Sequence, residues 1–315
     1  MFFNKKYTKI FYKVRKDFDT KLIPCVHCGF PLCSLWFRKR RFLYPLIIIF
    51  IFFFKSLASG QCYEKNTLFQ SGERLYYDAC YNLAFIWLHA GLATFSVDEE
   101  VKNGKNLYKL TSIGVSHKGY DRFMKVRDTF EVFVDPITIE PFEYKQINNE
   151  GSFSAEHYYK FDKVNRKINM RIRRENNPWE VTTIDWQECY VDMLSMIYKA
   201  RLIDFSKYKE NDQIPIYVIV DGEKFELYIR YKGKEIITNR DGKRYRCLKF
   251  TPLLVEGTVF NKGEDMTVWI TDDKSRVPII VEAKILIGSV KAIFTGAEGL
   301  KYPIEAEIVD DLMIK

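Results

Sequence analysis

Apolar and polar residues alternate along most of the chain beyond residue 61, with the period of two that is typical of β-strands. The clearest case is the segment 214–220, where isoleucine and valine occupy every second position. The dipeptide Asp221-Gly222 follows it, and a second alternating segment covers 224–232. Asx-Gly dipeptides suit tight turns that need positive φ, so this stretch predicts an antiparallel hairpin with one face buried. Asn103-Gly104 and Asp241-Gly242 predict two further hairpins.

The same alternation recurs in segments 129–134, 167–173, 266–271 and 290–295. We count about a dozen such strands, with no helix-length segments between them that would form crossovers. The predicted fold class is therefore mainly β. It is a large antiparallel curved sheet, either barrel-like or a sandwich.

One segment has a helical pattern instead. In "VDMLSMIYKARLID", Asp192 is placed to cap a helix near 191–203, and Lys199 and Arg201 suit its last turn. The apolar residues of one helical face are Val191, Leu194, Ile197 and Leu202. A single helix in an antiparallel sheet protein usually plugs a barrel mouth or covers an open edge, so we expect Asp192–Leu202 near such a mouth.

The N-terminal part has the pattern of an export signal. The apolar segment Phe42–Phe54 is too short for a transmembrane helix, and it follows the basic residues Arg38–Arg41. Ala58 and Gly60 are small residues at the positions that a signal peptidase requires, which predicts cleavage after Gly60 and a mature chain that begins at Gln61. This predicts a periplasmic or secreted protein of a Gram-negative-type envelope.

The leader also allows two other interpretations. Residues 42–54 can instead be retained as a membrane anchor, or Cys62 can carry a lipid. Gln61 is too large for the position before a lipidated cysteine, and Leu57 lies too far from it. The leader also contains Cys25, Cys28 and Cys33, but without a second ligand pair these cysteines do not predict a zinc site.

Excluding the leader 1–60 changes the charge of the chain. The whole sequence has a net charge of +8, but residues 61–315 contain 37 basic and 39 acidic residues. A nearly neutral mature chain lacks the basic surface that nucleic acid requires, so we expect no nucleic-acid partner. We expect a linker at 61–71, one β-rich domain at 72–300 and a C-terminal tail at 301–315.

The mature chain keeps four cysteines, and an exported protein meets oxidising conditions. The sequence leaves open whether they are thiols or form disulfides: Cys62, Cys80, Cys189 and Cys247.

Residues 61–315 contain none of the common hydrolase, nucleotide-binding or metalloprotease motifs. His89 fits a packed or edge histidine better than a general base, and Asp272-Asp273 fits a turn better than a catalytic carboxylate pair. Cys189 has no histidine near it in sequence that would activate it. The sequence therefore supports no enzyme, cofactor or metal, although active sites also assemble from distant positions.

Several longer stretches resemble a known family. They are "GERLYYDACYNLAFIWLHAGLATFSVDE", "VRDTFEVFVDPITIEPFEY", "YVDMLSMIYKAR" and the segment from Met266 to Ala292. Within them the most specific pieces are Gly91-Leu92-Ala93, the block Val268–Pro278 and Gly288-Ser289-Val290. From about residue 72 to 295 the chain resembles the bacterial envelope family catalogued as domain of unknown function number 3108. The resemblance implies an exported β-rich protein and assigns no role to any residue.

Aromatic residues make up 16% of the chain. Most are expected to fill the core, but some suit the lining of a cavity, because binding sites are mostly apolar and aromatic. The candidates for contact with a ligand are Trp87, His89, Tyr158 and Trp269. We expect a non-enzymatic binder or carrier of an apolar or amphiphilic, lipid-like molecule. The alternatives are a protein-interaction or assembly factor of the envelope and an enzyme acting on envelope glycan or lipid.

Overall fold

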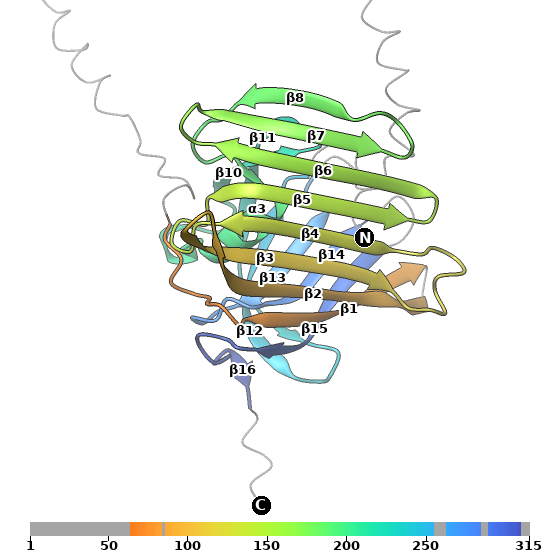
Figure 1. Cartoon of the computed structure of the whole chain (residues 1–315). Helices are drawn as coiled ribbons and strands as arrows, with labels where there is room; N and C mark the ends of the chain where they lie inside the picture. Colours follow the sequence, from red (N-terminus) through yellow and green to blue (C-terminus); the bar gives the residue numbers. More distant parts are fainter. Residues whose placement is uncertain (1–63, 84–85, 255–262, 285–288, 310–315) are drawn as a thin grey trace, which may run out of the picture. The chain divides into compact units, whose positions relative to one another are not determined.

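The computed structural model describes residues 64–83, 86–254, 263–284 and 289–309. These residues form strands that belong to one sheet, an α-helix and a 3₁₀ helix (Figure 1). The strands are β1 Arg74–Leu83, β2 Ile86–Lys102, β3 Lys105–Ser116, β4 Arg127–Val134, β5 Pro141–Glu150, β6 Phe153–Asp162, β7 Lys167–Arg174, β8 Glu180–Asp185, β9 Val191–Asp192, β10 Gln213–Val220, β11 Glu223–Thr238, β12 Arg244–Pro252, β13 Met266–Thr271, β14 Pro278–Lys284, β15 Ser289–Glu298 and β16 Glu307–Ile308. The helices are α3 Met193–Arg201 and η3 Phe205–Lys207.

Neighbours along the chain are mostly neighbours in the sheet. From β8 back to β1 each strand pairs with the one before it, β1 then pairs with β15, and the order continues down to β9. Within the described residues every pair is antiparallel except β9–β10. The sheet is not closed, since β8 and β9 stand at its two ends. The prediction of a large antiparallel sheet is confirmed, and the described residues contain sixteen strands where the alternation predicts about a dozen.

The Asx-Gly dipeptides mark hairpins as predicted. Asn103 and Gly104 both have positive φ, 51° and 74°, between β2 and β3. Asp221 and Gly222 have φ of 54° and 87° between β10 and β11, whose register pairs Val220 with Glu223. At Asp241-Gly242 only the glycine has positive φ, because the turn between β11 and β12 is longer.

Glycine at position 91 has a separate structural cause. A Cβ built on Gly91 would lie 2.1 Å from the carbonyl oxygen of Val115 on the neighbouring strand β3. The pairing of β1 with β2 also shifts register beside this residue, between Ala79 and Cys80. Gly91 therefore permits an unusually close approach of β2 and β3.

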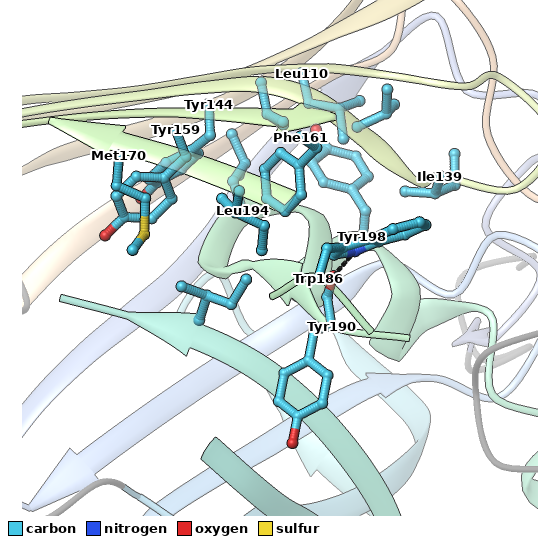
Figure 2. Packing of buried hydrophobic residues seen from close by; sticks show 14 of the residues in the cluster. Leu110, Ile139, Tyr144, Tyr159, Phe161, Met170, Trp186, Tyr190, Leu194 and Tyr198 are labelled. Carbon is cyan, nitrogen blue, oxygen red and sulfur yellow. Dashed lines mark hydrogen bonds between the residues drawn. The ribbon is translucent and has the colours of Figure 1, made fainter. Parts of the chain in front are cut away.

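Helix α3 begins where the sequence predicts. Asp192 is its N-cap, and Oδ1 of Asp192 accepts hydrogen bonds from the backbone N–H groups of Leu194 (2.9 Å) and Ser195 (3.0 Å). Leu194 and Tyr198 are buried in the main core cluster, together with residues of β3 to β7 (Figure 2). The helix therefore packs against the inward face of the sheet, with Leu194 and Tyr198 filling its core.

Strand β10 is covered on both faces. Its alternate residues Ile214, Ile216 and Val218 belong to one core cluster with β11, β12 and β13. Ile219, on the opposite face, packs into the cluster of β3 to β7 and α3. Strand β10 therefore contacts both core clusters, the one that it forms with β11 to β13 and the one formed by β3 to β7 and α3.

Segments on either side of the expected domain also pack onto it. In the predicted linker, Phe69 is buried and its ring centroid lies 5.0 Å from that of Tyr198. In the predicted tail, β16 pairs with β12, and Ala306 is fully buried. No helix of the described residues is long and apolar enough to cross a membrane. The leader and its predicted cleavage site lie outside the described residues.

The cysteines differ in state. Cys189 is disulfide-bonded, whereas Cys80 and Cys247 are free and buried. Burial raises the pKa of the Cys247 thiol to about 12 and also raises that of Cys80, so both thiols stay protonated at neutral pH. Cys62 lies outside the described residues, as do the three cysteines of the leader.

Candidate ligand-binding site

The inward face of β5 carries polar residues where the alternation of a core strand would place apolar ones. Tyr144, Gln146 and Asn148 follow one another at every second position, and all three are buried, Asn148 with 1% of its surface exposed. We call these three residues the polar track. Successive residues on one face of a strand are close enough to bond to each other, which lets a polar row exist inside a core.

The polar track is a directional chain of hydrogen bonds. The hydroxyl of Tyr144 donates to Oε1 of Gln146 (2.7 Å), and Nε2 of Gln146 donates to Oδ1 of Asn148 (2.5 Å). The amide Nδ2 of Asn148 is buried and has no hydrogen-bond partner within the described residues. A buried donor without a partner costs about 1–3 kcal/mol. The track therefore ends in a donor to which an acceptor oxygen would bind favourably.

The strands on either side add polar groups to the same face. Asp128 on β4 is buried near Asn148, because the register pairs Thr129 with Ile147. On β6, His157 pairs directly with Gln146 and is also buried. A polar region therefore spans β4, β5 and β6 around Gln146 and Asn148.

The turn between β10 and β11 approaches this region. The backbone N–H of Gly222 donates to the hydroxyl of Tyr159 (3.1 Å), whose oxygen lies 3.2 Å from Nδ1 of His157. Nε2 of His157 is 3.7 Å from Oδ1 of Asp221. These contacts hold the hairpin turn against the inward face of β6.

The tyrosines of the region remain neutral. Burial raises the pKa of Tyr144 well above its usual value of 10, and burial also raises the pKa of Tyr159. Both hydroxyls therefore keep their protons throughout the physiological range; that of Tyr144 donates to Gln146 and that of Tyr159 accepts from Gly222.

Apolar and aromatic side chains surround the polar region. Tyr144, Tyr159 and Met170 lie together on the inward face, above Leu194 of α3 (Figure 2). Phe130 pairs with Gln146 from β4 and is only partly buried. A molecule bound here would meet hydrogen-bonding groups and an apolar surface at once, which are the two parts of an amphiphile.

A second buried polar group links distant segments. Arg201 at the end of α3 and Glu73 before β1 form an ion pair at 2.5 Å, with side chains 3% and 1% exposed. The guanidinium also donates to the carbonyl oxygens of Ser275 and Arg276, both at 3.1 Å. Because its donors are used by the protein itself, this pair anchors α3 to β1 and to the turn between β13 and β14.

The block Val268–Pro278, singled out in the sequence, also has a structural role. Asp273 accepts hydrogen bonds from the N–H of Ser275 (2.9 Å) and from the N–H groups of Glu305 and Ala306 (both 2.8 Å). It therefore holds the C-terminal segment against the turn, as the interpretation of Asp272-Asp273 as a turn implies.

Of the predicted ligand-contact residues, Tyr158, Trp269 and His89 are not brought together. Tyr158 lies on the face of β6 opposite to Tyr159, with its ring near Trp179 and its hydroxyl donating to Glu156. Trp269 lies on the face of β13 opposite to Val268 and Ile270, and donates to Glu235 (3.0 Å). His89 is half-exposed beside Asp78 and Arg240. Trp87 is on β2, but its side chain lies outside the described part.

Sequence reasoning missed the polar track. The residues of β5 are polar on both faces, since Lys145 and Asn149 alternate with Gln146 and Asn148. The alternation therefore offers no contrast that would show which face is buried. Among the described residues no group of three or more His, Cys, Asp or Glu side chains is placed to hold a metal ion.

These features define a β-rich protein with a polar row inside an apolar, aromatic core. The chain belongs to the family described as protein of unknown function (DUF3108), whose profile matches residues 77–295. No curated protein matches the chain. Among solved structures, it is similar to the β-barrel-like protein of a domain of unknown function, DUF1849, from Brucella abortus. That likeness has 5% identity and a TM-score of 0.47, and covers 74% of this chain and 99% of the other.

Proposed function

We propose that this protein is exported and binds an amphiphilic, lipid-like molecule without transforming it. The observation that carries the proposal is the polar track, which lies in an apolar, aromatic core and ends in the unpartnered amide of Asn148. Because Nδ2 is a donor, the bound group must be an acceptor, such as an ester or amide carbonyl oxygen. The apolar part of the ligand would lie against partly buried residues such as Phe130.

The test of ligand binding uses protein purified without denaturation. Organic extraction and mass spectrometry should find a stoichiometric amphiphile, and monooleoylglycerol should displace the apolar dye Nile red from the extracted protein. A clean extract together with no gain in dye fluorescence would contradict the proposal.

Two variants make this test specific. Asn148→Leu keeps the branched shape of the side chain but removes Nδ2 together with Oδ1, which accepts from Gln146, so it should weaken monooleoylglycerol binding by at least about tenfold, as expected for the loss of one hydrogen bond to a buried group. Asn149→Leu changes the same residue type on the exposed face of the same strand and should leave the affinity unchanged. Equal affinities of the two variants would remove Asn148 from the site.

The state of Cys189 supports export. A disulfide at Cys189 is expected in an oxidising compartment and is rare in the cytosol. If the chain is cleaved after Gly60, intact mass should show a chain starting at Gln61, and a non-reducing peptide map should show Cys189 joined to another cysteine. A lipid on Cys62, or retention of residues 36–60, would contradict this cleavage.

A further inference from the structure

The loop of residues 117–125, between β3 and β4, presents an aromatic side chain to solvent. Phe123 is 85% exposed, although most phenylalanines of the described residues are at least partly buried. Figure 1 shows this loop extending beyond the strands, at the end of the sheet where β5 turns into β6. A single exposed apolar side chain is common on protein surfaces, so Phe123 becomes informative only together with the conformation and the charges of its loop.

The loop is held in a fixed conformation. The backbone N–H groups of Tyr120 and Phe123 donate to the carbonyl oxygens of His117 (2.8 Å) and Tyr120 (2.9 Å). The carboxylate of Asp121 accepts from Nη2 of Arg127 (2.8 Å) and from the hydroxyl of Ser116. The exposure of Phe123 is therefore built into the turn, since the backbone and Asp121 together fix the position from which it projects.

Three cations flank the exposed ring. Lys118, Arg122 and Lys125 are exposed, and none of them forms an ion pair within the described residues. The one acidic residue of the loop, Asp121, is paired with Arg127, whose hydrogen bonds lower the pKa of Asp121. The tip of the loop therefore combines one apolar anchor with three cations that form no ion pair within the described residues.

This combination fits an anionic lipid surface better than a protein. A stable protein interface buries about 800 Å² on each partner, far more than one loop tip offers. Membrane association needs only a few apolar side chains in the interface together with cations, each of which raises the partitioning to an anionic surface by about fivefold. We propose that the loop 117–125 docks the protein on an anionic membrane surface, with Phe123 inserted among the lipids.

The position of the loop gives the docking a consequence. The carbonyl oxygen of Lys125 accepts from the N–H of Gly151 (2.7 Å), and Val126 bridges to Glu150 at the end of β5. Asn148 lies two residues before Glu150 on the same face. Docking would therefore bring the end of the polar track close to the membrane. The docking inference goes beyond ligand binding and does not depend on it, because the two are measured separately.

The test measures partitioning of natively purified protein to vesicles of phosphatidylcholine with about 30% phosphatidylglycerol, and to vesicles of phosphatidylcholine alone. Phe123→Ala should reduce partitioning to the anionic vesicles about tenfold. Val164→Ala, at an exposed valine in the turn between β6 and β7, should leave it unchanged. Replacing Lys118, Arg122 and Lys125 together by Ala should remove the preference for anionic vesicles.

A second measurement locates the contact. In the variant Phe123→Trp, brominated lipids should quench the tryptophan fluorescence more strongly than in the parent protein, because the new indole is inserted among the lipids. Equal partitioning of Phe123→Ala and the parent protein would overturn the proposal, as would an absence of this additional quenching. Self-association that disappears in Phe123→Ala, without vesicle binding by the parent, would assign the loop to a protein contact and also overturn it.

Discussion

Replacing Glu73 by Gln should destabilise the protein strongly while changing almost nothing in shape. Arg201 would stay buried with its charge, keeping its bonds to the carbonyl oxygens of Ser275 and Arg276. It would lose two charge-assisted hydrogen bonds to Glu73, at 2.5 and 3.2 Å, each worth about 1.5–3 kcal/mol. One hydrogen bond from the guanidinium to the neutral amide oxygen would return about 1 kcal/mol, which leaves a loss of about 2–5 kcal/mol. This range overlaps the loss of about 3–5 kcal/mol that is typical when one partner of a buried ion pair is removed.

Urea denaturation followed by circular dichroism measures this loss as a change in the free energy of unfolding. The matched control is Glu307→Gln, because Glu307 pairs with Lys243 at 3.0 Å on the surface. Exposed pairs contribute little, so this variant should unfold close to the parent protein.

A double-mutant cycle completes the test. Arg201→Leu alone should also be costly, because it leaves the Glu73 carboxylate buried without its partner. Combining Arg201→Leu with Glu73→Leu should cost less than the two single losses added together, since neither charge is then left unpaired. A loss below about 1 kcal/mol for Glu73→Gln, or strict additivity in the cycle, would refute the reasoning.

Three further predictions concern single positions. Gly222→Val should lower the stability by about 1–3 kcal/mol, since φ is +87° there and a Cβ would lie 3.0 Å from the side chain of Ile172. In a thermal melt, the control variant Lys224→Val on the following strand should unfold close to the parent protein. Gly91→Ala should unfold at a clearly lower urea concentration, because the added Cβ meets a backbone carbonyl that cannot move aside. Burial raises the pKa of Asp192 to about 6, above its value in the unfolded chain. Its contribution to the free energy of unfolding is therefore most favourable below about pH 4 and is lost as the pH rises through about 6. Asp192→Asn should abolish that part of the pH dependence of unfolding.

The parts of the fold that depend on local chemistry could be predicted from the sequence. Asn103-Gly104 and Asp221-Gly222 mark hairpins because positive φ favours those residues wherever they occur. Asp192 caps α3 because its side chain bonds to N–H groups two and three residues ahead. Neither feature requires knowledge of distant segments.

The remaining parts depend on contacts between residues far apart in sequence. Phe69 looks like part of a linker until Tyr198 is known to lie beside it. The inward orientation of Gln146 and Asn148 follows from the pairing of β5 with β4 and β6, and a strand that is polar on both faces gives no sign of it. Tyr158 and Trp269 are candidates by residue type alone, and residue type does not show which face of a strand a side chain occupies.

The position of β1 within the sheet has a consequence for synthesis. One edge of β1 can pair with β2 as soon as both strands have been synthesised. The other edge pairs with β15, for example Tyr77 with Phe294, so it stays unpaired until β15 has been synthesised. A ribosome will have made nearly the whole domain before that edge is covered, and contacts so distant in sequence form slowly. Until then β1 presents open N–H and C=O groups to which a strand of another chain can pair. Chains that terminate before residue 289 should therefore aggregate through β1, even though β1 to β8 carry a complete set of local hairpins.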